Sequence, residues 1–172
     1  ARFYLAACHI ACEQPAEAME ELQAVMRSRP FRAGASFLLG GLYLGQGEIA
    51  KAIEQLEKCH AQFPWYEDAA ALLACALRHK GEKARAKALL GEVLERDPLH
   101  FPSLAEAWFL EGEAAKRQFI KTLRGEVQSF LELACDYARF ALYQEAFDVL
   151  ALYLQTAGES KADPMACYHL AY

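Results

Sequence analysis

Apolar residues recur at helical spacing along this chain, and residues 36–46 show the pattern most clearly. Leucine and tyrosine residues there fall three or four positions apart, which predicts an amphipathic helix. A second apolar series follows in residues 52–59, and Gly47 between the two series suits the left-handed backbone that ends a helix. Pro64 stops the second helix, because proline cannot continue the backbone hydrogen bonds. The pattern therefore predicts a helix–turn–helix unit.

This unit repeats with a period of 34 residues, which separates Pro30, Pro64 and Pro98. The same spacing relates Leu5, Leu39 and Leu73; Ala6, Gly40 and Ala74; Ala18, Ala52 and Ala86; and Leu22, Leu56 and Leu90. A single helix pair of this kind cannot bury its apolar face alone and must stack on its neighbours. We therefore expect three stacked repeats, over residues of about 1–30, 31–64 and 65–98.

Beyond residue 98 the period breaks and then returns. Ser103 with Glu106, and Ser129 with Glu132, have the spacing of a capping box, which predicts that helices begin at these serines. Because Ala1 falls inside a predicted helix and the last residues only begin a further unit, we expect the chain to be a fragment of a longer repeat protein. All of residues 1–172 are expected to form one solenoid, with a degenerate helical pair at 99–125, a further repeat at 126–159 and the start of another at 160–172.

The composition favours helices throughout. The chain contains 33 Ala, about one residue in five, whereas Val, Ile and Thr together number ten. Alanine has the highest helix propensity, and strands favour β-branched residues, so an all-β or doubly wound α/β fold is disfavoured. The predicted fold class is all-α.

The charge balance limits the classes of partner. Lys and Arg number 18 against 23 Asp and Glu, a net charge of −5, which argues against a dedicated nucleic-acid-binding protein. No apolar run reaches membrane-spanning length, and the sequence shows no secretory signal. The six cysteines lie among Ala and Leu without a CxxC pair, which is typical of buried, reduced thiols. We therefore expect a cytoplasmic protein that binds neither nucleic acid nor membrane.

The sequence offers no arrangement of catalytic residues. It lacks a phosphate-binding glycine loop, a nucleophile elbow and an HExxH motif. Cys8, His9 and Cys12 fall within about one helical turn, but zinc requires four protein ligands, or three and a water. Two basic groupings, in residues 78–87 and 116–124, have glutamates among or beside them (Glu82 and Glu113) and are expected to be solvated helix faces. We expect no metal and no cofactor, and the chain is not expected to be an enzyme.

The repeated residues resemble the tetratricopeptide repeat family. The middle unit has the family's pattern at Leu39, Gly40, Tyr43, Gly47, Ala52, Leu56 and Pro64, and the third unit has it at Leu73, Ala74, Leu77, Gly81, Ala86, Leu90 and Pro98. The first unit departs from it with Glu13 in place of the turn glycine, and the unit at 126–159 departs with Ala141. The resemblance implies an all-α, right-handed α–α superhelix (a solenoid) of helix–turn–helix repeats.

In this family the first helices of successive repeats form a concave face that binds partner proteins or peptides. We call the corresponding residues of this chain the inner face. They are Phe3, Tyr4, Ile10, Phe37, Leu38, Leu44, Leu72, Cys75, Arg78, Leu131 and Arg139. This lining is mostly apolar, which favours an amphipathic helix or another domain of the same polypeptide as partner. The chain is therefore expected to be an interaction or scaffold module.

Two further expectations concern the last residues. Tyr168, Leu170 and Tyr172 are expected to leave an apolar edge through which the chain self-associates. The segment from Phe130 to Tyr172 is also similar to the repeat region of large bacterial proteins that carry a β-rich domain of the glycan-processing type. That similarity implies an alternative function, a helical appendage that organises the domains or the oligomer of a bacterial carbohydrate-active enzyme.

Overall fold

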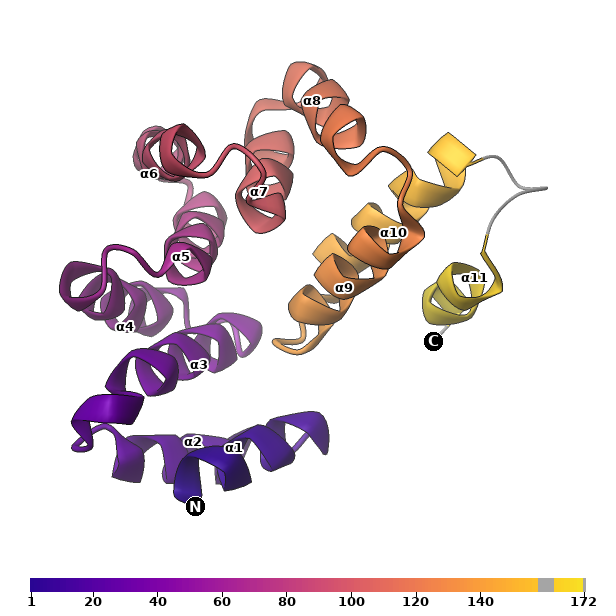
Figure 1. The fold of residues 1–172 in the computed structure, drawn as a ribbon. Coiled ribbons are helices and arrows are strands. Elements are labelled where there is room, and N and C mark those ends of the chain that lie inside the picture. The colour runs from indigo at the N-terminus through magenta and orange to yellow at the C-terminus, as the bar shows by residue number, and fades with distance from the viewer. Residues whose placement is uncertain (158–162, 172) are drawn as a thin grey trace. The chain divides into compact units, whose positions relative to one another are not determined.

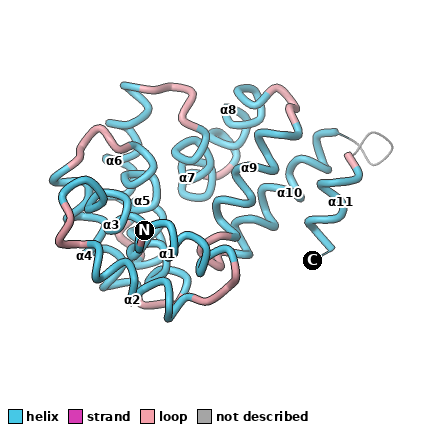
Figure 2. Tube along the Cα trace, turned by 60° about the horizontal axis from the view of Figure 1, so that its bottom comes forward, coloured by secondary structure: helices cyan, strands magenta, loops and turns pink. Residues whose placement is uncertain are grey.

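The computed structural model describes residues 1–157 and 163–171, and these residues form helices joined by short turns, with no strand among them (Figure 2). The elements are α1 (Arg2–Ala11), α2 (Pro15–Val25), a 3-10 helix η1 (Arg29–Phe31), α3 (Arg32–Gly45), α4 (Ile49–Gln62), α5 (Glu67–Lys80), α6 (Lys83–Arg96), α7 (Phe101–Glu111), α8 (Glu113–Leu123), α9 (Val127–Ala138), α10 (Tyr143–Ala157) and α11 (Pro164–Ala171). The predicted all-α fold is confirmed.

The chain divides into two compact units, Ala1–Val93 and Leu94–Tyr172. The placement of the two units relative to one another is not determined. The formation of one continuous solenoid by all residues therefore stays a prediction.

Within each unit, consecutive helices pack as antiparallel pairs. In the first unit α1 packs on α2 and α3 on α4, and in the second unit α7 packs on α8 and α9 on α10 (Figure 1). Contacts of α2 with α3 and of α4 with α5 stack successive pairs in the first unit. The helix–turn–helix pairs α1–α2 and α3–α4, expected in residues of about 1–30 and 31–64, are therefore present, and the boundaries of the repeats stay a prediction.

The small residues of the repeat lie where helices touch. Ala6, Ala18, Ala52 and Ala86 have no exposed surface. A Cβ atom added to Gly40 of α3 would lie 2.5 Å from Cγ of Leu56 on α4. Only a residue without a side chain allows this approach, so Gly40 sets the closeness of the α3–α4 pair.

The turns that follow α1, α3, α5 and α9 share one backbone conformation, whether or not they contain glycine. Glu13, Gly47, Gly81 and Ala141 all have positive φ angles, of 55°, 75°, 87° and 57°. After each of them a backbone amide bonds the carbonyl five residues earlier, at 2.8 Å for Gln14 to His9, 2.9 Å for Glu48 to Tyr43, 2.9 Å for Glu82 to Leu77 and 3.1 Å for Leu142 to Tyr137. This is the hydrogen bond of a Schellman motif. The departures of the first unit and of the unit at 126–159 from the family pattern therefore leave the turn geometry unchanged.

Both predicted capping boxes are wrong. Helix α7 begins before Ser103, and the ring of His100 caps it by accepting a hydrogen bond from the Ser103 amide. Ser103 is fully buried inside the helix. Helix α9 begins at Val127, which places Ser129 in its first turn, where the Ser129 amide donates to the carbonyl of Glu126.

Candidate interaction surfaces

The structure distributes the inner-face residues over three levels of exposure. Two of them are exposed, Tyr4 (66 % of its surface) and Arg139. Half-buried residues are Phe3, Ile10, Phe37, Arg78 and Leu131, and buried residues are Leu38, Leu44, Leu72 and Cys75. The accessible aromatic part of the predicted face thus lies on α1 and α3. Binding through the whole set stays a prediction.

An aromatic cluster joins α1 to the start of α3. The ring of Phe3 stacks on that of Phe31, with 5.3 Å between centroids, and Tyr4 meets Phe31 edge-on at 6.4 Å. A Cβ atom on Gly34 would lie 2.9 Å from the Phe3 ring, so Gly34 makes room for it. The sequence patterns did not single out Phe31, although its position directly after the repeat-ending Pro30 was the available signal.

A second aromatic pair joins two neighbouring first helices. The rings of Phe37 on α3 and Tyr66, the residue before α5, lie 5.2 Å apart. Helices α3 and α5 also contact each other directly. Both rings are half-buried, so part of each remains accessible. Sequence reasoning found Phe37 and missed Tyr66.

In the second unit, α9 presents few apolar groups. Arg139 forms an ion pair with Asp136 at 2.8 Å, and Leu131 is half-buried. Exposed aromatic residues of this unit lie elsewhere, with Tyr143 and Phe147 on α10 exposed by 61 % and 52 %. Neither was among the predicted inner-face residues.

The predicted apolar edge at α11 is described only in part. Met165 and Tyr168 are 53 % and 55 % exposed. The side chain of Leu170, and Tyr172 altogether, lie outside the described residues.

The basic grouping in residues 78–87 forms surface ion pairs with interleaved acids. Arg85 contacts Glu57 at 2.6 Å and also pairs with Glu82, and Lys80 contacts Glu82 at 2.7 Å. Hydrogen bonds from Lys80 and Arg85 lower the pKa of the Glu82 carboxyl. These groups are solvated, as the sequence predicted, and Arg85 joins α6 to Glu57 on α4.

The expectation of uniformly buried cysteines is wrong. Cys8, Cys12 and Cys135 are exposed, whereas Cys59 and Cys75 are buried. Burial raises the pKa of the Cys59 thiol to about 11, so Cys59 stays protonated and unreactive at neutral pH. None of these five cysteines is joined in a disulfide.

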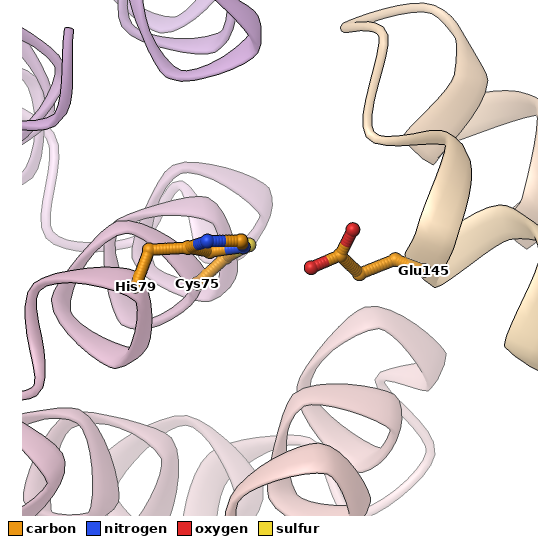
Figure 3. Close-up of side chains that lie close together, drawn as sticks. All are labelled: Cys75, His79 and Glu145. Atoms are coloured by element: carbon orange, nitrogen blue, oxygen red, sulfur yellow. The ribbon is translucent and has the colours of Figure 1, made fainter. Parts of the chain in front are cut away.

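Cys75 and His79 project from the same side of α5, one helical turn apart (Figure 3). Glu145, the third residue labelled there, belongs to α10 of the other unit. Two side chains of one unit provide fewer ligands than a zinc site needs. We therefore assign no metal site to this pair.

No helix among the described residues is both long and apolar enough to span a lipid bilayer.

Comparison of the chain with known protein families and solved structures agrees with the geometry of the helix pairs. Residues 43–107 match the model of the tetratricopeptide repeat family. No curated protein matches the chain. Among solved structures, the thermophilic tetratricopeptide repeat protein TTC0263 of Thermus thermophilus has a TM-score of 0.64 at 20 % identity, with 99 % of this chain and 95 % of that chain covered.

Two further structures show the same fold. The crystal structure of MamA has a TM-score of 0.62 at 18 % identity, covering 90 % of this chain and 95 % of that chain. A tetratricopeptide repeat protein from Parabacteroides merdae has a TM-score of 0.62 at 16 % identity, covering 99 % of this chain and 70 % of that chain. Residues 43–107 therefore match the tetratricopeptide repeat family model, and the chain shares its fold with solved tetratricopeptide repeat proteins.

Proposed function

We propose that this chain is a protein–protein interaction or scaffold module without catalysis of its own. It binds an amphipathic helix, belonging to a partner protein or to another domain of the same polypeptide, through the inner face. Proteins with this fold generally act in protein–protein interaction or scaffolding, which supports the general class.

The observation that carries the proposal is the accessible aromatic surface on the first helices of the first unit. Tyr4 on α1 is largely exposed, and Phe37 on α3 is half-buried against Tyr66. Aromatic residues are the most frequent anchors of protein interfaces, because one ring contributes a large contact area at a small cost in side-chain entropy. Two or three such anchors would provide affinity in the micromolar range, after the cost of association is subtracted.

The chain offers a matched pair of residues for a test. Tyr4 and Tyr143 are exposed to a similar extent, 66 % and 61 %, but only Tyr4 belongs to the inner face. A display library of amphipathic helical peptides would be selected on the unaltered protein. Affinity for the selected peptides would then be measured by fluorescence anisotropy for Tyr4→Ala and Tyr143→Ala.

We expect Tyr4→Ala to weaken peptide binding about tenfold, the typical effect of losing an interface anchor. Tyr143→Ala should change it less than about twofold, because the residue lies outside the proposed site. Phe37→Ala provides a second position on the same face, with circular dichroism to check that the variant remains folded. Failure to select any helical peptide, or an equal loss with Tyr143→Ala, would refute the proposal.

A further inference from the structure

The connection between α2 and α3 is a local concentration of positive charge in an acidic protein. Arg27, Arg29 and Arg32 are the only charged residues between Glu21 and Glu48, whereas the whole chain carries −5. We call residues 27–32 the basic turn. It belongs entirely to the first unit.

The arginines of the basic turn differ from several other basic side chains in lacking acidic partners. Lys51, Lys58, Lys80, Arg85, Lys116 and Arg139 form ion pairs with neighbouring carboxylates. Within the part of the chain that the structure describes, no ion pair joins Arg27, Arg29 or Arg32 to a carboxylate. Arg27 and Arg29 are also exposed. Their guanidinium groups are thus available to an anionic partner.

The basic turn is held in place on both sides. Arg32 donates a hydrogen bond from Nε to the carbonyl of Met26 at 3.1 Å, which closes the turn. Phe31 is stacked on Phe3 and lies edge-on to the exposed ring of Tyr4. The charged groups therefore stand beside an accessible aromatic surface on a fixed backbone. Because this part of the protein is already ordered, binding a partner here would cost it little conformational entropy.

We infer that the basic turn docks a short acidic peptide segment that also carries an aromatic or large apolar side chain. Guanidinium groups bind carboxylates through paired hydrogen bonds, and the rings of Phe31 and Tyr4 would contact the apolar side chain. A short peptide meets only the basic turn and the neighbouring Tyr4 ring. A nucleic acid or an anionic membrane extends further and would meet the rest of the first unit, which has 8 basic and 11 acidic residues outside the basic turn and repels it.

This site shares Tyr4 with the inner face, but it also requires the positive charge of the arginines, which the inner-face function does not. The probe is a fluorescent peptide of consecutive glutamates with one central phenylalanine, and its affinity is measured by anisotropy at low and at moderate salt. The test variant is Arg27→Glu/Arg29→Glu. The matched control is Arg117→Glu/Lys121→Glu, which makes the same charge change at exposed positions on α8.

We expect the unaltered protein to bind the peptide with an affinity that falls as salt rises. The Arg27→Glu/Arg29→Glu variant should lose about tenfold or more in affinity, and the control less than about twofold. The neutral variant Arg27→Gln/Arg29→Gln should show an intermediate loss, and the amphipathic peptides selected on the inner face should bind all variants equally. That last result separates failure of this site from failure of the proposed function.

Three outcomes would overturn the inference. The first is absence of binding by the unaltered protein, and the second is an equal loss in the control variant, which would indicate an effect of net charge alone. The third is preferential binding of phosphatidylserine vesicles or single-stranded RNA, measured in parallel, which would assign the basic turn to a membrane or a nucleic acid.

Discussion

The hydroxyl of Tyr137 on α9 donates a hydrogen bond to the buried carboxylate of Glu106 on α7, with 2.7 Å between Tyr137 Oη and Glu106 Oε1. Only 2 % of Glu106 and 6 % of Tyr137 are exposed. Helices α7 and α9 begin successive helix pairs of the second unit, so this bond joins one pair to the next.

Removing this hydroxyl should destabilise the second unit. In Tyr137→Phe the buried carboxylate of Glu106 loses a donor, and we expect the free energy of unfolding to fall by about 1–3 kcal/mol. Urea unfolding followed by circular dichroism measures the change. Tyr143→Phe serves as control, because its side chain is largely exposed, and it should have almost no effect. An unchanged stability in Tyr137→Phe would show that the bond contributes nothing.

Two glycines inside helices should respond to alanine in opposite directions. A Cβ on Gly40 would lie 2.5 Å from Cγ of Leu56, whereas a Cβ on Gly91 of α6 would meet nothing within 4 Å. Gly40→Ala should therefore destabilise the protein by about 1–3 kcal/mol through overpacking. Gly91→Ala should stabilise it by about 0.5–1 kcal/mol, because alanine is the better helix former. Thermal and urea unfolding of both variants check this, and a gain in stability for Gly40→Ala would contradict the close packing of α3 on α4.

Replacing Ala141 with glycine should stabilise the turn between α9 and α10. Its φ of 57° lies in the left-handed region, where a Cβ atom is unfavourable. We expect Ala141→Gly to raise the free energy of unfolding by about 0.5–1 kcal/mol, less than the full backbone penalty because glycine also loosens the unfolded chain. The reverse change, Gly47→Ala, at a φ of 75°, should lower it by about 1 kcal/mol.

Ala138→Gly is the control for the turn prediction, because this residue ends α9 in a helical conformation. It should destabilise the protein, since glycine gains nothing there and costs backbone entropy. If Ala141→Gly also destabilises, the left-handed conformation at residue 141 is wrong.

Stability should fall at alkaline pH through Cys59. Burial raises the pKa of its thiol from 9.0 to about 11 in the folded protein. Between these values the unfolded chain releases the thiol proton and the folded chain does not, so unfolding becomes more favourable as pH rises. Below pH 9 both states are protonated and this contribution is constant.

The measurement is urea unfolding at neutral pH and at about pH 10, with the Cys59→Ala variant as reference because it lacks the titrating group. Alanine creates a cavity and lowers stability at both pH values. The difference in the free energy of unfolding between the unaltered protein and Cys59→Ala should nevertheless be smaller at the higher pH, because only the unaltered chain carries the titrating thiol. An equal or larger difference there would show that the thiol pKa is not raised by folding.

The helix pairs could be predicted from sequence because their causes are local. Gly40, Ala52, Pro64 and their counterparts recur at 34 residues, and each has a physical role within its own pair. Helix ends were less predictable. Ser103 has the spacing of a cap, but the ring of His100 caps α7 and Ser103 is buried in its first turn. Whether a serine caps a helix or is buried depends on what packs over it.

The candidate surfaces could likewise be predicted only in part from the sequence. Periodicity placed Tyr4 and Phe37 on first helices, but Phe31 and Tyr66 lie outside the periodic helix pattern and were recognised only as ring partners in the structure. Likewise the arginines of the basic turn are visible in the sequence, yet their lack of acidic partners depends on the paths of α2 and α3.

The sequence by itself determined the all-α class, the repeat length and the positions of the turns, because propensity, glycine and proline act over a few residues. Tertiary structure decided that Glu13 and Ala141 adopt the glycine conformation, since packing of the paired helices outweighs the local cost of a positive φ. It also decided which residues are exposed, such as Tyr4, and which are buried, such as Leu44 and Glu106. Exposure depends on neighbours distant in the chain, which a periodic pattern does not specify.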